Sequence, residues 1–487
     1  MRTKQSDCTD VFRTKNLISN PSDICLILSI KIMKDNMYID THTHLFYPNF
    51  NGEVDSVIER ARQSGVNYMI VPGTDLASSA QAIELARKYD FIYAAVGVHP
   101  HDSKDWDESV LKSLEELAAD KKVVAIGETG LDYFYDFSPK EMQIKAFEEQ
   151  INLAIKLNLP LIIHNREADK DVMEIMRRYK GKIRAQFHCF AGSLEDAREL
   201  IEMHHYISFT GNITFTKADN LRKIVSRVDS ENLLLETDSP FMAPVPHRGK
   251  RNEPAYINHV AEKIAELHHL SPTDIARTTS YNAYKLFGIG MKPKVSFTYK
   301  IGNSLYINVT NRCNADCVFC DRKGEAVIKG YNLKMSKSEE PEALVYIGEI
   351  GDPKDYSEIV FCGYGEPTIR WDVVKDVARY VKENGGRTRM NTDGHGNFIN
   401  KRDITPELKD LIDTVSISLN SVDPEQYGKL MRVDPKMHSE MLDFARKAKN
   451  FTKVVLSVVG MSVIDTESAK KFVTEEVGVD FREREYF

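Results

Sequence analysis

Short apolar runs alternate with amphipathic segments between residue 37 and about residue 290 of this 487-residue chain. The runs have the length of buried strands, whereas segments such as 54–63, 140–156 and 169–179 have the apolar spacing of helices. A strand–helix repeat is typical of a parallel sheet, because parallel neighbours need a crossover between them. Eight such units predict a closed (β/α)8 barrel, with strands at 37–44, 67–71, 91–96, 122–126, 159–163, 184–187, 206–209 and 232–235.

Imidazole and carboxylate side chains follow several of these expected strands directly. The C-terminal strand ends of such a barrel form the face where catalytic residues gather. His42 and His44 are two residues apart, so their side chains leave the first strand on the same side. One such histidine alone would more often be a core residue with satisfied hydrogen bonds, but the whole set indicates a metal site. The set consists of His42, His44, Glu128, His164, His188 and Asp238.

This set suits two divalent cations, which Glu128 can bridge. Two ions about 3.5–4 Å apart can stabilise both the attacking and the leaving oxygen of a phosphoryl displacement and lower the pKa of bound water. Asp238 can accept the proton of that water, so we expect Glu128 and Asp238 to be the catalytic residues. The other expected ligands are His42 and His44, with Asp238, for one ion, and His164 and His188 for the second.

Seven stretches around and after these residues resemble the TatD family of metal-dependent deoxyribonucleases. The resemblance covers residues 37 to about 290 and implies exonucleolytic hydrolysis of DNA, with RNA as an alternative, using Mg²⁺, Mn²⁺ or Zn²⁺ at the six residues named above. The stretches are Asp40-Thr-His-Thr-His44, Gly97-Val-His-Pro-His101, Ile126-Gly-Glu-Thr-Gly-Leu-Asp132, Ile163-His-Asn-Arg-Glu-Ala168, Phe187-His-Cys-Phe-Ala-Gly192, Glu236-Thr-Asp-Ser-Pro240 and Pro246-His-Arg-Gly-Lys-Arg-Asn-Glu-Pro254.

Basic residues near the expected metal centre can hold the phosphates of a substrate. Arg248 and Arg251 belong to a basic tract that follows Asp238, although such a tract is more often a solvated loop. His101 and Arg166 are weaker candidates for the same contacts, as is His99.

Two other functions remain open for the first half of the chain. The barrel and its histidines also permit an amidohydrolase-like enzyme that cleaves a small cyclic amide or ester. The second possibility is a non-catalytic scaffold that binds nucleic acid for the second half of the chain. The nuclease is favoured because Glu128 can bridge two metals beside the basic tract at Arg248, and because a complete ligand set argues against a scaffold.

A second series of strands is expected after residue 303. Gly288, Gly290 and Pro293 mark a boundary, so we expect a linker at 291–303 between a first domain at 37–290 and a second at 304–487. The whole chain is therefore expected to be an α/β protein of two barrels. The second is a partial (β/α)6 barrel, with strands at 305–309, 358–361, 387–391, 414–419, 453–459 and 479–484.

Three cysteines follow the first strand of this second domain, in the sequence Cys313-Asn-Ala-Asp-Cys317-Val-Phe-Cys320. Three thiolates on a [4Fe–4S] cluster leave one iron open for a further ligand, whereas a structural zinc site needs four ligands. Cys362 is the residue that would complete a zinc site, and this alternative remains open.

The Cys-x3-Cys-x2-Cys spacing resembles the radical S-adenosylmethionine (SAM) superfamily over residues 304–487. Tyr364-Gly365-Glu366-Pro367 stands where that family has Gly-Gly-Glu-Pro, and the whole chain resembles TatD-associated radical SAM proteins. The resemblance implies that the open iron binds SAM, and that reduction by an electron donor such as flavodoxin or ferredoxin cleaves SAM to a 5′-deoxyadenosyl radical. The expected SAM contacts are Gly365, Glu366, Asn391 and Ser418.

Composition limits the partners and the compartment. A net charge of −7 argues against the coating of a polyanion, so contacts with nucleic acid should be local. Seven cysteines, three of them at metal-ligand spacing, predict a reducing, cytoplasmic environment. The apolar run 24–30 is too short to span a membrane, and no membrane contact is expected. Residues 1–36 are expected to be a leader, either disordered or upstream of the true start codon.

Overall fold

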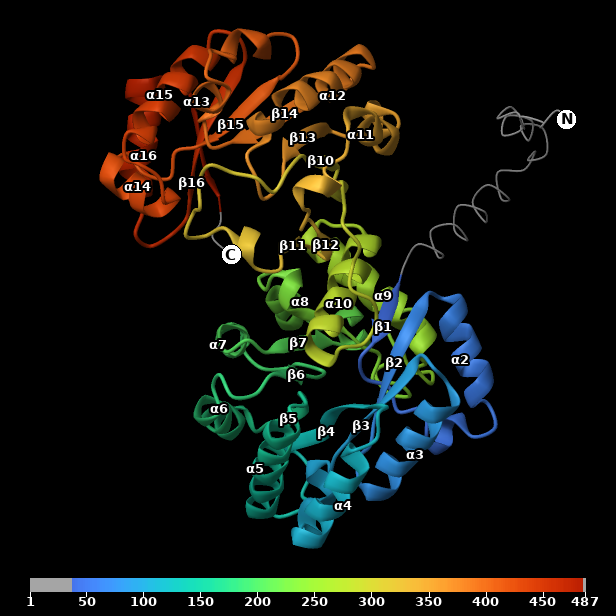
Figure 1. Cartoon of the computed structure of the whole chain (residues 1–487). Coiled ribbons are helices and arrows are strands. Elements are labelled where there is room, and N and C mark those ends of the chain that lie inside the picture. Colours follow the sequence, from blue (N-terminus) through green and yellow to red (C-terminus); the bar gives the residue numbers. More distant parts are fainter. Residues whose placement is uncertain (1–36, 485–487) are drawn as a thin grey trace, which may run out of the picture. The chain divides into compact units, whose positions relative to one another are not determined.

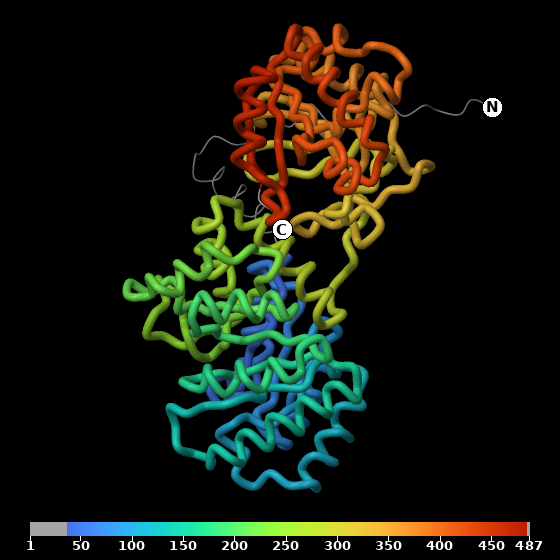
Figure 2. Tube along the Cα trace, turned by 90° about the vertical axis from the view of Figure 1, so that its left-hand side faces the viewer, coloured from blue at the N-terminus to red at the C-terminus, as the bar shows by residue number. Residues whose placement is uncertain are grey.

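The computed structural model describes residues 37–484, and the chain divides into two compact units between Lys292 and Pro293. Figure 1 labels the elements of both units, and Figure 2 follows the same chain as a trace. The leader predicted for residues 1–36 lies outside the described residues. Each unit is an α/β structure with its own hydrophobic core.

The first unit is a parallel barrel whose eight strands lie in sequence order (Figure 1). Its two ends meet, because Thr41 N donates to Leu235 O at 3.0 Å and Thr43 forms a parallel bridge with Ser239. The predicted (β/α)8 barrel is confirmed. Its strands are β1 (Tyr38–Asp40), β2 (Val66–Pro72), β3 (Ile92–Val96), β4 (Val123–Asp132), β5 (Leu161–Arg166), β6 (Ala185–Phe187), β7 (Tyr206–Phe209) and β8 (Leu233–Leu235).

Helices follow the strands and cover the outside of this barrel (Figure 1). Several of them have N-cap residues whose side chains bond to the first turn of the helix. At the start of α3, Asp75 Oδ1 accepts from Ser78 N at 2.7 Å, and the Ser78 hydroxyl accepts from Asp75 N. The helices are α2 (Val54–Gln63), α3 (Leu76–Lys88), α4 (Glu108–Ala118), α5 (Lys140–Leu157), α6 (Asp169–Arg178), α7 (Leu194–Glu202), α8 (Asp219–Val225), α9 (Ile257–His268) and α10 (Pro272–Phe287).

The last helix, α10, covers the N-terminal ends of the barrel strands. Asn282 Nδ2 donates to Ser230 O and Leu233 O at 2.9 and 2.7 Å, just before and at the start of β8. Leu286 and Phe287 join the apolar cluster formed by the strands. The polar residues lie at the opposite end of the barrel, where the strands finish.

The second unit contains a seven-stranded sheet in the order β17-β16-β15-β14-β13-β10-β9. The six strands from β10 to β17 are parallel, as expected for a partial barrel. Strand β9 pairs antiparallel with β10 and lies inside the segment expected to be a linker at 291–303, so this segment contributes to the second unit. The strands are β9 (Thr298–Ile301), β10 (Ser304–Asn308), β13 (Glu358–Cys362), β14 (Thr388–Thr392), β15 (Thr414–Ser418), β16 (Lys453–Val459) and β17 (Asp480–Arg484).

Helices also separate most of the parallel strands of the second unit. In α12, buried Val374, Val377 and Val381 recur at the spacing of one helix face and pack into the core. A short hairpin of β11 (Val327–Ile328) and β12 (Tyr331–Asn332) follows the cysteine segment. The helices are α11 (Ala343–Ile350), α12 (Trp371–Glu383), α13 (Gly396–Asn400), α14 (Pro424–Met431), α15 (Met437–Ala448) and α16 (Thr466–Lys471).

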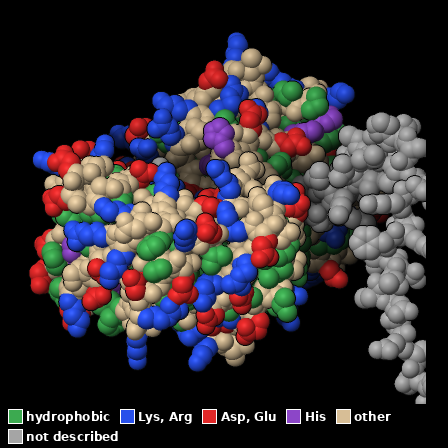
Figure 3. Space-filling view, turned by 90° about the horizontal axis from the view of Figure 1, so that it is seen from above, with side chains coloured by type: hydrophobic (Ala, Val, Ile, Leu, Met, Phe, Trp, Pro, Cys, Tyr) green, Lys and Arg blue, Asp and Glu red, His purple; other side chains and the backbone are tan. Residues whose placement is uncertain are grey.

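The helices of residues 37–484 include none with the length and apolar character needed to cross a membrane. Basic and acidic side chains are interspersed on the face shown in Figure 3 and do not gather by sign.

Candidate metal centre and cluster-binding loop

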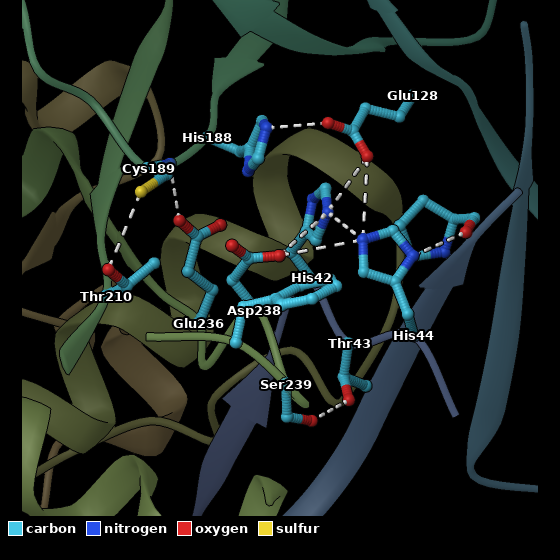
Figure 4. Close-up of polar contacts among 12 residues, drawn as sticks. His42, Thr43, His44, Glu128, His188, Cys189, Thr210, Glu236, Asp238 and Ser239 are labelled. Carbon is cyan, nitrogen blue, oxygen red and sulfur yellow. Dashed lines mark hydrogen bonds and ion pairs between the residues drawn. The ribbon is translucent and has the colours of Figure 1, made fainter. Parts of the chain in front are cut away.

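The six predicted metal ligands lie together at the C-terminal end of the first barrel, with Glu128 at their centre. Glu128 Oε2 lies 3.4 Å from His42 Nε2 and 3.6 Å from His44 Nε2. Asp238 Oδ1 lies 3.6 Å from His44 Nε2 and 3.8 Å from His42 Nε2. Figure 4 shows these four side chains converging from the segment after β1, from β4 and from the segment after β8. They form the first group of donors.

The second carboxylate oxygen of Glu128 faces a different group. Glu128 Oε1 lies 2.8 Å from His188 Nε2 and 3.0 Å from His164 Nδ1, and the two imidazole nitrogens are 3.2 Å apart. His99 Nε2 lies 3.5 Å from the same oxygen. The two oxygens of one carboxylate therefore face different imidazoles, as expected of a ligand that bridges two ions, and the two groups adjoin where the His42 and His188 rings stack with centres 4.0 Å apart.

The spacing of these donors fits metal coordination. Four ligand atoms each about 2.1 Å from a common ion in a tetrahedron lie roughly 3.4 Å apart. The five separations that join the Nε2 atoms of His42 and His44 to each other and to the two carboxylates run from 3.1 to 3.8 Å. Imidazole nitrogens and carboxylate oxygens suit several divalent ions, so the donor set alone does not distinguish Mg²⁺, Mn²⁺ and Zn²⁺.

Electrostatics keep the central carboxylate ionised. Burial alone would raise the pKa of Glu128, but the surrounding imidazoles, His188 foremost, hold it well below its usual value. Burial opposes the charge on His188, yet Glu128 raises the pKa of His188 to about 9. Burial lowers the pKa of His42 to about 4.

Asp132 fixes the orientation of His164. Asp132 Oδ2 lies 3.0 Å from His164 Nε2 and 2.9 Å from His101 Nε2. A carboxylate on the far nitrogen of a ligating histidine sets its tautomer and raises its basicity. This role was not predicted from the sequence, although Asp132 is the last residue of the stretch Ile126–Asp132. His101, predicted to contact phosphate, is paired with Asp132.

Two further buried carboxylates hold the loops that carry the ligands. Asp40 Oδ2 accepts from Thr237 Oγ1 at 2.7 Å, which ties the end of β1 to the loop after β8. Glu236 Oε1 accepts from Cys189 N at 2.5 Å (Figure 4), directly after His188. Burial raises the pKa of Glu236 to about 8. Sequence reasoning missed both residues, which lie in the quoted stretches but look there like ordinary strand ends.

The predicted phosphate-binding arginines are in different environments. Arg251 donates to Glu53 Oε2 at 2.9 Å and to Asn49 O at 2.7 Å, so its guanidinium already has protein partners. Arg248 is exposed, with its guanidinium 4.3 Å from the centre of the Phe215 ring. Arg166 ends β5 and is described below.

In the second unit, the three cysteines occupy the loop that follows β10. Burial raises the pKa of the Cys317 thiol to about 12, and Cys313 Sγ lies 3.8 Å from Asp393 Oδ2. Three half-buried thiols on one loop suit an iron–sulfur cluster. Cys362 and the residue before it, Phe361, belong to two different apolar clusters. The Sγ of Cys362 lies 3.1 Å from the Tyr299 hydroxyl. The structure therefore does not bring Cys362 to the other three.

Two of the four predicted SAM contacts follow β13. A Cβ atom at Gly365 would lie 2.3 Å from Thr310 O, so the loop needs glycine there. The positive φ of this loop is at Gly363, and Tyr364 does not have a positive φ. Glu366 is buried and accepts from Asp393 N at 2.8 Å.

The other two predicted SAM contacts are strand residues with protein partners. Asn391 Oδ1 accepts from Arg389 at 2.7 Å, and Ser418 Oγ accepts from Arg484 at 3.2 Å. The analysis of the sequence did not single out Arg484, whose position on the last strand carries no motif.

Comparison with known families identifies both units. Residues 39–288, half of the chain, match the family model of TatD related DNase, and residues 307–474 match the Radical SAM superfamily. A Bacillus subtilis protein named "Uncharacterized metal-dependent hydrolase YabD" is 46% identical over 254 residues, which are 52% of this chain and 100% of that protein. An Edwardsiella piscicida protein named "3'-5' ssDNA/RNA exonuclease TatD" is 37% identical over 256 residues, 51% of this chain and 98% of that protein.

A solved structure gives the same result for the first unit. The crystal structure of YjjV, a TatD homologue from Escherichia coli K12, is 33% identical, with a TM-score of 0.50. The alignment covers 52% of this chain and 98% of the homologue. These relatives therefore correspond to the first barrel alone, and the second unit is additional to them.

Proposed function

Because the chain belongs to the TatD-related DNase family and carries a radical SAM domain, we propose that its first unit is an exonuclease. Its substrate is single-stranded DNA or RNA, and it uses two divalent ions. The observation that carries the proposal is Glu128, whose two carboxylate oxygens face different groups of imidazoles. The relative named as a 3'-5' ssDNA/RNA exonuclease supports the choice of substrate.

The ions would be held by the six residues of the centre, with Glu128 between them, and would polarise the phosphate and acidify the attacking water. The protein's own groups complete the site. Asp238 is the carboxylate of the first group with the more accessible side chain, 12% exposed against 4% for Glu128, so it can accept a proton from the attacking water. Arg248 is exposed and follows Asp238 in the chain, which supports its proposed contact with a substrate phosphate.

The test is cleavage of oligonucleotides labelled at the 5′ or the 3′ end, with Mg²⁺, Mn²⁺ or Zn²⁺ added in turn. Stepwise shortening of single strands from one end is expected, and Glu128→Gln and Asp238→Asn should lose most of it because each removes charge from the ions. Asp219→Asn, at a carboxylate that is 91% exposed, is the matched control and should cleave normally. Cleavage at the normal rate by Glu128→Gln would refute its assignment.

We also propose that Cys313, Cys317 and Cys320 hold a [4Fe–4S] cluster that binds SAM and takes electrons from a flavodoxin or a ferredoxin. The cluster would supply reductive cleavage of SAM. After anaerobic reconstitution, the protein should contain iron and sulfide and release 5′-deoxyadenosine when reduced with SAM.

Paired cysteine variants test this assignment against zinc. Cys317→Ser should remove the cluster and the release of 5′-deoxyadenosine, whereas Cys362→Ser should keep both, because Cys362 lies in a separate apolar cluster. Bound zinc that is lost in Cys362→Ser would support a four-cysteine zinc site and refute the cluster.

A further inference from the structure

Three aromatic side chains stand in solvent close to the metal centre. Phe134, Tyr135 and Phe137 are 50%, 40% and 57% exposed, and together we call them the aromatic platform. Exposed apolar residues that occur singly need no explanation, but a contiguous group beside a catalytic site marks a binding surface. No residue of the platform contributes to the barrel core.

The platform is fixed to the metal centre through Asp132. Its Oδ1 accepts from Phe134 N and Tyr135 N at 3.0 Å each, and its Oδ2 contacts His164, a predicted metal ligand. At the far end of the segment, Ser138 Oγ donates to the carbonyl of His101 at 2.7 Å. The aromatic residues are thus held in place before any ligand arrives.

Positive charge accompanies the exposed rings. The Arg166 guanidinium lies 3.9 Å from the centre of the Phe134 ring and 4.8 Å from that of Tyr135. Tyr135 and Phe137 are stacked with ring centres 5.3 Å apart, and the His101 ring packs edge-on against Phe137 at 4.8 Å. Flat aromatic faces with a guanidinium beside them suit a ligand that has both planar rings and negative charge.

We propose that the aromatic platform stacks unpaired bases of a single-stranded nucleic acid whose scissile phosphate lies at the metal centre. This proposal rests on the proposed nuclease function and adds the surface that selects single strands. Every base offers a π face, so stacking is tolerant of sequence, whereas bases in a duplex have their faces covered. Arg166 then lies where it can meet the phosphate between stacked bases.

The test compares two probes that differ only in their bases. Fluorescein-labelled oligodeoxythymidine of eight residues and an abasic strand of the same length are titrated by fluorescence anisotropy, in the Glu128→Gln background so that the probe is not consumed. Phe134→Ala and Phe137→Ala should each weaken binding of the thymidine strand about tenfold and leave the abasic strand unchanged. Phe137→Trp should restore the affinity.

Phe398→Ala is the matched control, because Phe398 is 51% exposed and belongs to the second unit, so it should bind both probes normally. Unchanged affinity for the thymidine strand in both platform variants would overturn the proposal. Equal losses for both probes would also overturn it, because the platform would then act on the phosphates or on the fold.

A small phosphodiester without bases separates this proposal from the proposed function. In the otherwise wild-type protein, the platform variants should hydrolyse a phosphodiester of two abasic deoxyribose units at the normal rate, since this ester has no planar ring for the platform to stack. Failure of the wild type to cleave both this ester and oligonucleotides with every divalent ion would refute the nuclease. A base-dependent loss of binding in the platform variants would, even then, support the platform.

Discussion

Glu128 and Asp132 both lie on β4, four residues apart, and they act on His164 from two sides. Glu128 Oε1 is 3.0 Å from one imidazole nitrogen and Asp132 Oδ2 is 3.0 Å from the other. The first carboxylate shares a metal position with the ring, and the second fixes which nitrogen faces that position. At this scale the site depends on a chain of carboxylate and imidazole contacts as well as on its ligands.

Asp132→Asn should lower the affinity for the ion that His164 and His188 would hold by about 10- to 100-fold, because the amide no longer fixes the His164 ring. Titration of the metal-free protein followed by calorimetry measures this affinity. Asp102→Asn, at an exposed carboxylate in the 3-10 helix Pro100–Asp105 before α4, serves as the control. An unchanged affinity for both ions in Asp132→Asn would return Asp132 to a purely structural role.

The two arginines of the basic tract should respond differently to truncation. Arg248→Ala should raise KM for an oligonucleotide by at least about tenfold and reduce the inhibition by salt, since a charge-assisted contact with phosphate is lost. Arg251→Ala should leave KM close to normal and act on stability, because Arg251 is paired with Glu53. The same KM for Arg248→Ala as for the wild type would assign Arg248 to a solvated loop.

At the scale of elements, the strands were predictable because each is a short apolar run bounded by polar residues. All eight strands of the first barrel and the six parallel strands of the second lie at or within a few residues of the predicted positions. Strand β9 was not predicted, because Thr298–Ile301 mixes polar and apolar residues among lysines and gains its order from pairing with β10.

The candidate site also has some features that could be predicted from the sequence and others that could not. The six predicted ligands converge because barrel topology brings strand ends together. The contacts of Asp132, Glu236 and the aromatic platform depend on loop conformations, which residue spacing alone does not specify. His99 illustrates the difference: its motif was visible, but only the fold places its Nε2 3.5 Å from Glu128.

His205, just before β7, makes the stability of the first barrel depend on pH. It is 1% exposed, neither ring nitrogen has a hydrogen-bond partner among the described residues, and burial lowers its pKa from 6.5 to about 4. Between these values the unfolded chain binds a proton that the folded chain does not, so stability falls as pH drops from 6.5 to 4. The full loss is about 3 kcal/mol.

Denaturant unfolding of the metal-free protein across this range measures the effect. His205→Phe should show a shallower fall in stability towards acid than the wild type. His204→Gln, at the exposed neighbouring residue, should keep the wild-type slope. Equal slopes for His205→Phe and the wild type would mean that His205 is not the titrating group.

The whole molecule combines two units with separate cores and separate sets of functional residues. All predicted ligands of the nuclease precede residue 292, and all three cluster cysteines follow it. Cys317→Ser should therefore keep metal-dependent cleavage of oligonucleotides at the normal rate while it loses the cluster. Loss of cleavage in a folded Cys317→Ser protein would show that the units are coupled.

The central claim is that Glu128 joins two metal positions in the first barrel. The most direct measurement is the number of divalent ions bound per chain, by calorimetry on the Cys317→Ser protein, which leaves out the cluster. We predict two ions for this protein and at most one for the same protein with Glu128→Gln. A single ion before the Glu128 substitution, or two ions after it, would contradict the bridging role of Glu128.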